Sequence, residues 1–205
     1  MKKMKALLIL FALFSTLTSC FNSQKKGVEN ETQAVADTVA AYSEMQDKQH
    51  CFIVISKQEL KLYVCEALDD DTVRIAGFPV CLGKVVGQKQ RVGDMRTPES
   101  TWSQPFTITE IVDASGWCHD FKDGRGSILA YGNWFMRLKT PGFTGIGIHG
   151  STNNEDSVPG RASEGCIRLR NADLDLLKEQ YAYKGMSVVI KGENEGLKPF
   201  EEKYY

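Results

Sequence analysis

The sequence of 205 residues has no surplus of charge of either sign, because 25 Lys and Arg residues stand against 26 Asp and Glu residues. A protein that binds nucleic acid normally carries a basic excess, so the balance argues against a nucleic-acid partner. Metal-ligand spacing is also missing, since three His and six Cys residues form no C-x-x-C or H-x-x-x-H pattern. The sequence therefore predicts no metal site.

The sequence also has no apolar run of the roughly 20 residues that a membrane-spanning helix needs. Its longest apolar run, Ala6–Phe14, follows three lysines and has the size and flanks of a secretory signal peptide. The tetrapeptide LTSC, at positions 17 to 20, resembles the lipobox of bacterial lipoproteins. That resemblance implies cleavage before Cys20 and a stable membrane anchor made of several acyl chains on Cys20. An ordinary secretory signal with a chance cysteine is the alternative.

Composition predicts four segments along the chain. Residues 1–20 form the signal peptide, residues 21–49 a polar tether, residues 50–191 a domain, and residues 192–205 a C-terminal tail. Hydrophobic residues make up 42% of the sequence and charged residues 25%, as in ordinary globular proteins. We therefore expect one folded domain of typical size.

Short β-branched and aromatic stretches separated by Gly, Pro and Asp predict a mainly β domain, a sandwich or a barrel. Cys51–Ser56 and Leu60–Cys65 are expected to form a hairpin, and further strands are expected at 73–80, 106–112, 127–131, 135–138, 146–149, 167–169 and 186–190. One helix is expected to follow, with Asn171 as its N-cap, Leu174, Leu177 and Tyr181 on one face, and Gly185 after its end.

Four cysteines, Cys51, Cys65, Cys81 and Cys118, are expected to be buried small apolar residues or members of disulfides. Cys51 and Cys65 are equally distant from Gln58, so the hairpin could place them opposite each other. Both possibilities stay open on the sequence.

Two segments carry residues suited to nucleophilic chemistry, GIGIHG at 145–150 and RASEGCIRL at 161–169. Cysteine attacks only as its thiolate, and a neighbouring imidazole that takes the thiol proton is the usual activator. His149 and Cys166 lie 17 positions apart, and the loop 150–162 could fold back to bring them together. A buried cysteine and a structural histidine are the alternative.

The two segments resemble the L,D-transpeptidase catalytic domain of the YkuD type, whose motif is a His followed, after a variable loop, by Ser/Thr-His-Gly-Cys. Here His149-Gly150 precedes the loop, and Ser163-Glu164-Gly165-Cys166-Ile167-Arg168 follows it. The stretches SKQELKLYVCE, FPVCLGK, GDMRTPES and KGMSVVIKG resemble further family segments in the same order, so the resemblance covers residues 51–191. It implies a β-sandwich of mixed sheets with one helix after the Cys166 segment, and neither metal nor cofactor.

The same resemblance implies roles for the motif residues. Cys166 would be the nucleophile and His149 its proton acceptor and donor, with the Gly150 carbonyl orienting the imidazole. The backbone N–H groups of Gly165 and Cys166 would form part of an oxyanion hole. Ser163 would buttress this loop.

Other candidates are less closely tied to the motif. Arg168 would position a substrate carboxylate or brace the site. Glu164 replaces the usual His and could pair with Arg161 or Arg168, or raise the pKa of Cys166. Two aromatic residues near the GIGIHG segment could line a substrate groove or belong to the core, Tyr131 and Trp134. His50 and His119 are expected to be surface or structural residues.

The implied substrate is a tetrapeptide stem of peptidoglycan. The family cleaves its terminal L,D bond, releases D-Ala, and transfers the acyl group from the cysteine to an amine of a second stem, which gives a 3→3 cross-link. Water, a D-amino acid or a protein could be the acceptor instead, and a catalytically silent wall-binding lipoprotein is the alternative from another class. The anchor at Cys20 would hold the domain at a membrane of the cell envelope, on its periplasmic or extracytoplasmic side. The oligomeric state is not set by the sequence.

Replacing the predicted lipidation site tests the anchor. Cys20→Ala removes the only thiol that the lipobox could acylate, so the protein should leave the membrane fraction or keep its signal peptide. Fractionation with immunoblotting measures this. Unchanged membrane association together with a cleaved signal would contradict the lipoprotein hypothesis.

Overall fold

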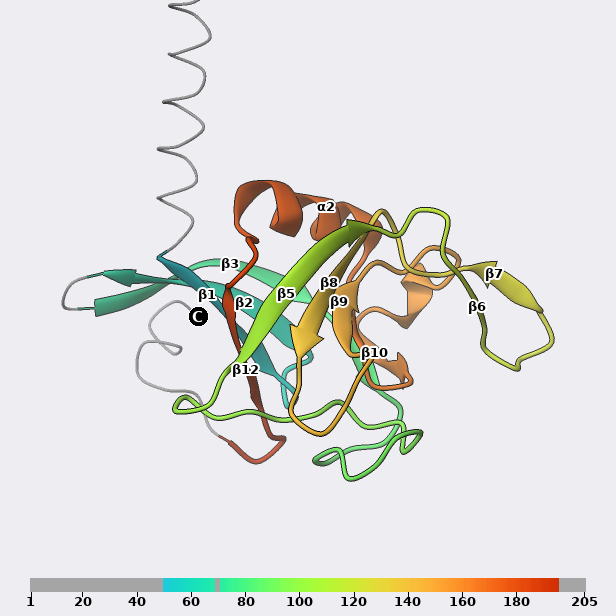
Figure 1. Ribbon diagram of the computed structural model, residues 1–205, viewed down its shortest axis with the longest axis horizontal. Helices are drawn as coiled ribbons and strands as arrows, with labels where there is room; N and C mark the ends of the chain where they lie inside the picture. Colours follow the sequence, from blue (N-terminus) through green and yellow to red (C-terminus); the bar gives the residue numbers. More distant parts are fainter. Residues whose placement is uncertain (1–49, 69–70, 196–205) are drawn as a thin grey trace, which may run out of the picture. The chain divides into compact units, whose positions relative to one another are not determined.

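The computed structural model describes residues 50–68 and 71–195, which include nearly all of the predicted domain (Figure 1). The predicted signal peptide with Cys20, the tether 21–49 and the end of the tail lie outside the described residues. Within the described ranges, no helix has both the length and the apolar composition needed to cross a membrane.

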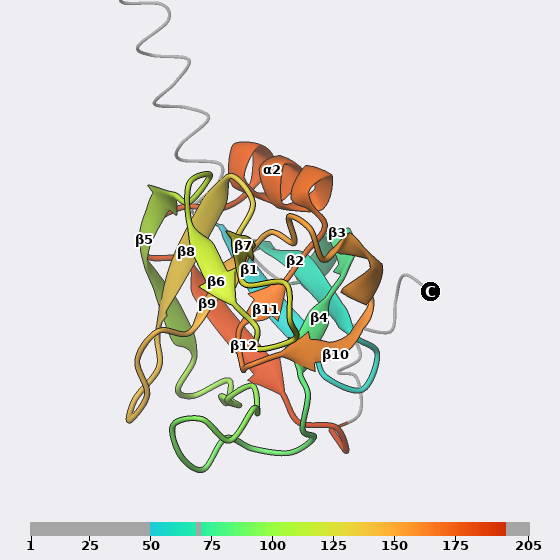
Figure 2. The same ribbon diagram turned by 90° about the vertical axis from the view of Figure 1, so that its right-hand side faces the viewer.

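Most described strands belong to a single mixed sheet of ten strands, in the order β10-β4-β11-β9-β8-β5-β12-β1-β2-β3, while β6 and β7 form a separate hairpin (Figure 2). Their bounds are β1 Cys51–Ser56, β2 Lys61–Leu68, β3 Asp71–Pro79, β4 Cys81–Gly83, β5 Phe106–Asp113, β6 Cys118–Asp120, β7 Ser127–Leu129, β8 Trp134–Lys139, β9 Gly147–His149, β10 Gly160–Ser163, β11 Ile167–Arg168 and β12 Ser187–Lys191. A 3₁₀ turn, η1 (Glu155–Ser157), and one α-helix, α2 (Asn171–Gln180), complete the described elements.

The predicted class, mainly β with mixed strand directions and one helix after Cys166, is confirmed. Parallel pairs join β1 with β12, β9 with β11, and β10 with β4, whereas the other pairs are antiparallel. The sequence pattern missed β4, β6 and β10, which have three or four residues and show little alternation, whereas the equally short β7 and β9 were predicted as parts of slightly longer apolar stretches.

The long sheet curls around one apolar core, as the two layers of a sandwich do (Figure 2). Strands from both ends of the sheet and the buried face of α2 contribute to one cluster, which includes Ile53, Leu62, Phe78, Leu82, Ile108, Met136, Ile148, Ile167, Leu174 and Val188. Because β9 and β11 lie inside this sheet, the segments expected to carry the chemistry are built on a packed, rigid support.

The hairpin of β1 and β2 forms as predicted, but it does not bring Cys51 and Cys65 together. Its register pairs Cys51 with Glu66 and Phe52 with Cys65. Neighbouring residues of a strand point to opposite faces, so the two thiols lie on different sides of the sheet. Cys51 contributes to the main core and Cys65 to a smaller cluster. The bridge considered on the sequence is wrong, and the five cysteines of the described ranges are free thiols.

The predicted cap of the helix is also corrected. Arg170 is the N-cap residue, without a side-chain cap, and Asn171 is already helical. The Asn171 amide instead holds the loop after β9, because its Oδ1 accepts the Ser151 N–H at 2.9 Å and its Nδ2 donates to Thr152 Oγ1 at 3.0 Å. The Asn171 N–H donates to the Glu155 carboxylate at 2.8 Å. The start of α2 thus fixes the loop that follows His149.

A buried lysine fixes the segment 84–100, which lies between β4 and β5. The Lys57 ammonium donates to Glu99 Oε1 at 2.7 Å and to the Gly87 carbonyl at 2.9 Å. Only 1% of the Lys57 side chain is exposed, so its charge depends on these partners.

Removing the Glu99 carboxylate should therefore destabilise the fold. Glu99→Ala leaves a buried ammonium without its counter-ion, and we expect a loss of about 3 kcal/mol in the free energy of unfolding. Glu110→Ala is the matched control, because the ion pair of Glu110 with Arg137 is exposed and should be worth less than about 1 kcal/mol. Urea denaturation measures both. Equal losses of stability in the two variants would contradict a stabilising role of the buried Lys57–Glu99 pair. The double variant Lys57→Met/Glu99→Leu should regain most of the stability if the buried charge is the cause.

Candidate active site

The parallel pairing of β9 with β11 builds the site. Arg168 pairs with His149 and Ile167 with Ile148, so the residue just before β11, Cys166, lies beside β9 despite its distance in the sequence. Gly147 fits β9 against its other neighbour, β8, because a Cβ at this position would collide with the Phe135 ring and would lie 2.8 Å from the Met136 carbonyl. The sheet therefore brings the predicted pair into one place.

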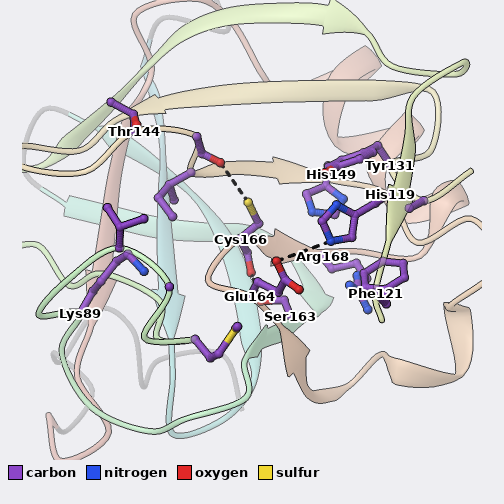
Figure 3. Close-up of a pocket in the computed structure, with 16 residues that line it drawn as sticks. Lys89, His119, Phe121, Tyr131, Thr144, His149, Ser163, Glu164, Cys166 and Arg168 are labelled. Atoms are coloured by element: carbon purple, nitrogen blue, oxygen red, sulfur yellow. Dashed lines mark hydrogen bonds and ion pairs between the residues drawn. The ribbon is translucent and has the colours of Figure 1, made fainter. Parts of the chain in front are cut away.

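His149 and Cys166 line the same pocket, which has a volume of about 280 Å³ (Figure 3). Its wall combines the two motif segments with residues from the segment 84–100 and from the β6–β7 hairpin. The lining residues are Lys89, Val92, Gly93, Met95, His119, Phe121, Ala130, Tyr131, Thr144, Gly145, Ile146, His149, Ser163, Glu164, Cys166 and Arg168.

The His149 ring is held by one hydrogen bond and two aromatic neighbours. Its Nδ1 lies 2.7 Å from the Gly150 carbonyl oxygen, and it packs against the rings of Tyr131 and Phe135 with centroid separations of 4.8 and 5.8 Å. A carbonyl oxygen only accepts, so Nδ1 carries the proton and Nε2 of the neutral ring is a bare acceptor. The structure thus places the Gly150 carbonyl where the resemblance implies it.

Burial favours the neutral forms of His149 and Cys166 in the free protein. Burial lowers the pKa of His149 to about 3, with Arg168 and His119 adding to the effect and the Gly150 carbonyl opposing it. Burial also raises the pKa of Cys166, helped by Glu164. The Cys166 thiol donates to the Gly145 carbonyl at 3.3 Å, as a protonated thiol can. This differs from the expected thiolate, because the burial of both groups penalises their charged forms more than Arg168, Lys89 and the Gly147 N–H favour the thiolate.

Ser163 supports the turn that carries Cys166. Its buried hydroxyl donates to the Cys166 carbonyl at 2.6 Å and accepts the Gly165 N–H at 3.1 Å. The first contact fits the buttressing role, whereas the second corrects the expectation for Gly165. The Gly165 N–H is engaged by Ser163 and is therefore not a free donor for an oxyanion.

Arg168 is buried beside the pocket with part of its guanidinium unsatisfied. Its Nη1 donates to Ser157 Oγ at 2.9 Å, and its Cζ lies 5.4 Å from the centroid of the Phe121 ring. Its buried Nε has no hydrogen-bond partner among the described residues. Burial lowers the pKa of Arg168, but a guanidinium stays protonated at neutral pH. The arrangement offers a fixed cation to an anionic ligand.

Glu164 pairs with neither of the arginines that the sequence suggested. Its Oε2 lies 3.5 Å from Nε2 of His119, which comes from β6 (Figure 3). Arg161 instead pairs with Glu193 at 3.1 Å. His119 is therefore a pocket residue, not the surface or structural residue expected, because the β6–β7 hairpin folds over the site.

The two aromatic candidates have different surroundings. Tyr131 lines the pocket, and burial, with Cys166 and Glu164 nearby, raises its pKa. Trp134 does not line the pocket, and the ammonium of Lys178, from α2, lies 4.3 Å from the centroid of its ring. Trp134 is therefore not a substrate-binding residue of this pocket.

Lys89 is a pocket residue that the sequence did not suggest. It is buried, and its ammonium donates to Asp94 Oδ1 at 2.8 Å. Desolvation opposes the ionisation of Asp94, but Lys89 and the backbone N–H groups of Gln90, Arg91 and Arg96 hold the pKa of Asp94 well below its usual range. A lysine in a polar loop carries no pattern that distinguishes it from a solvated one, so no sequence signal was available.

One comparison, with models of protein families, agrees with the motif. The family model described as YkuD, L,D-transpeptidase catalytic domain, matches residues 51–190. Among solved structures, the chain is similar to Bd1075 from Bdellovibrio bacteriovorus, with 23% identity, 69% of this chain and 48% of that chain covered, and a TM-score of 0.48. An L,D-transpeptidase from Mycobacterium smegmatis has 16% identity, coverage of 70% and 59%, and a TM-score of 0.47.

The helical cell shape determining protein Pgp2 from Campylobacter jejuni has 20% identity, coverage of 71% and 48%, and a TM-score of 0.49. The chain thus spans between 48% and 59% of the length of these three structures. No curated protein matches the chain by sequence.

The pH dependence of alkylation tests the neutral pair. Because burial raises the pKa of Cys166 and lowers that of His149, the thiolate fraction should rise about tenfold per pH unit from pH 6 to 8. Peptide-resolved mass spectrometry after timed iodoacetamide treatment measures the rate, with the exposed Cys118 as internal comparator. A plateau in the Cys166 rate below pH 7 would reveal a thiolate–imidazolium pair and contradict the neutral assignment.

Proposed function

Because the chain belongs to the YkuD family of L,D-transpeptidase catalytic domains, we propose that it is a cysteine L,D-transpeptidase that acts on peptidoglycan. Family membership confirms the resemblance read from His149 and the Ser163–Arg168 motif. The observation that carries the proposal is that His149, with its tautomer fixed by Gly150, lines one pocket with Cys166.

In the first half-reaction, Cys166 attacks the carbonyl of the terminal L,D peptide bond of a tetrapeptide stem. The thiol proton passes to Nε2 of His149 as the carbon–sulfur bond forms, so no charged pair has to exist beforehand. The C–N bond then breaks, His149 returns the proton to the leaving amine, and D-Ala departs. The product is a thioester on Cys166. Concerted proton transfer of this kind suits two groups whose charged forms are both disfavoured by burial.

Two groups are suited to hold the donor stem. The Cys166 N–H is the proposed oxyanion donor, since Gly165 donates to Ser163. Arg168 is the proposed partner of a stem carboxylate, because its buried Nε lacks a partner among the described residues and a charge-assisted hydrogen bond would satisfy it. Tyr131 lies beside both and would contact the stem.

In the second half-reaction, an amine of another stem attacks the thioester and forms a 3→3 cross-link. The acceptors considered on the sequence, namely water, a D-amino acid or a protein, would use the same acyl-enzyme and differ only in the last step. We place the reaction in the cell envelope, with the domain held at a membrane through Cys20.

The acyl-enzyme provides the test. The protein is mixed with purified disaccharide-tetrapeptide, and intact-mass spectrometry follows the thioester adduct and the release of D-Ala. We expect an adduct that maps to Cys166, none in Cys166→Ala, and acylation that is slower by a factor of about 10² to 10⁴ in His149→Ala, because its general base is lost. Trp134→Phe is the control, since Trp134 lies outside the pocket lining.

The absence of an adduct in folded protein would refute the enzymatic proposal and favour a silent wall-binding lipoprotein. An adduct on another residue, or full activity of His149→Ala, would refute the proposed pair. Circular dichroism of each variant separates loss of chemistry from loss of fold.

A further inference from the structure

A carboxylate stands at the mouth of the pocket, next to the proposed nucleophile. Glu164 is two residues before Cys166, its side chain is 41% exposed, and it pairs with His119, whose side chain is 30% exposed (Figure 3). Both line the pocket, and solvent reaches both. They therefore lie where a second substrate would arrive at an acyl group on Cys166.

The negative charge of Glu164 is unfavourable for the first half-reaction. It raises the pKa of Cys166, and so opposes the loss of the thiol proton as the sulfur attacks. The cations of the pocket, Lys89 and Arg168, are buried deeper and act in the opposite direction. A carboxylate beside a cysteine nucleophile is thus better explained by the second half-reaction than by the first.

The second half-reaction needs a positive charge to be bound and then removed. An alkyl amine of the lysine type has a pKa of about 10.4, so at neutral pH it arrives as an ammonium, which cannot attack a carbonyl. A carboxylate binds the ammonium by a charge-assisted hydrogen bond, and an imidazole can take its proton. Glu164 and His119 offer these two groups at one place.

Resting on the proposed acyl-enzyme, we propose that Glu164 and His119 form the acceptor-amine site, where Glu164 binds the ammonium of the incoming amine and His119 takes its proton. They are catalytic residues for acyl transfer to an amine and are not needed for transfer to water. The ligand class is a primary ammonium on a peptide stem.

The ammonium gives one proton to His119, and Glu164 stabilises the resulting imidazolium. The free amine forms a C–N bond to the thioester carbonyl, and the C–S bond breaks to release the Cys166 thiolate. The second proton of the amine nitrogen passes through His149 to that thiolate, and His119 returns its proton to solvent. The products are an amide and the resting thiol.

Other titratable and charged groups face this pair and are retained in the test. Arg168, Tyr131, Cys166 and His149 all interact electrostatically with Glu164 or His119, and Asp120 is the neighbour of His119 on β6. The comparison therefore uses neutral, similarly shaped replacements that leave all five in place.

The experiment measures how one acyl-enzyme divides between two acceptors. Purified disaccharide-tetrapeptide serves as donor and as amine acceptor, and mass spectrometry quantifies the cross-linked dimer against the hydrolysed tripeptide. Glu164→Gln should lower the dimer-to-tripeptide ratio about tenfold at pH 7, while acylation becomes faster because a charge that opposes the thiolate is gone. His119→Gln should also lower the ratio. The decrease in the dimer-to-tripeptide ratio should become smaller toward pH 9.5, where a growing fraction of the amine is already deprotonated.

Glu110→Gln is the matched control, because it removes the same charge from an exposed ion pair on β5 and should leave the ratio unchanged. An unchanged dimer-to-tripeptide ratio in Glu164→Gln, or an equal fall in acylation and in both products, would overturn the inference. Either result would indicate that the Glu164–His119 pair has only a structural role. A wild-type protein that forms the adduct but yields tripeptide alone would also overturn it, with the acyl-enzyme proposal intact. A missing adduct in the wild type would instead refute the proposed function itself.

Discussion

The parallel pairing of β9 with β11 is the constraint on which the site depends. It sets His149 opposite Arg168 and brings Cys166 beside Gly147, although a loop with its own 3₁₀ turn and β10 separates the two strands in the sequence. The loop can be long because α2 holds it through Asn171. Since both strands lie inside the core sheet, the fold itself sets the relative positions of His149 and Cys166.

Burial then decides the charge states around this pair. Desolvation favours the neutral forms of His149 and Cys166. Arg168 is buried with an N–H that has no partner among the described residues, and the buried ammonium of Lys89 is stabilised by the carboxylate of Asp94. Negative charge is kept at the solvent-exposed mouth, on Glu164. The pocket thus separates buried cations, which we propose bind stem carboxylates, from an exposed anion, which we propose binds an amine.

Local sequence patterns were sufficient for the longer strands of the core and for the meeting of His149 and Cys166 in one pocket. β1 and β5 were predicted within one residue at each end, and the helix was predicted in the right segment, because alternation and a buried helical face are local properties; its end was misplaced, since α2 stops at Gln180, well before Gly185. The partner of Glu164 and the pocket position of Lys89 could not be predicted, since they depend on where the β6–β7 hairpin and the segment 84–100 fold in space. The expected oxyanion role of the Gly165 N–H was not predicted correctly, because this N–H donates to the hydroxyl of Ser163, two residues earlier in the chain.

The account rests on a neutral imidazole that is protonated on Nδ1 and accepts at Nε2. Nitrogen-15 NMR of the His149 ring measures this directly, with His149→Gln identifying the signals. We predict one protonated nitrogen and one bare nitrogen at pH 7. This pattern should not change on acidification to pH 5, because burial lowers the pKa of His149 to about 3. Two protonated nitrogens at pH 7, or a bare Nδ1, would contradict the account.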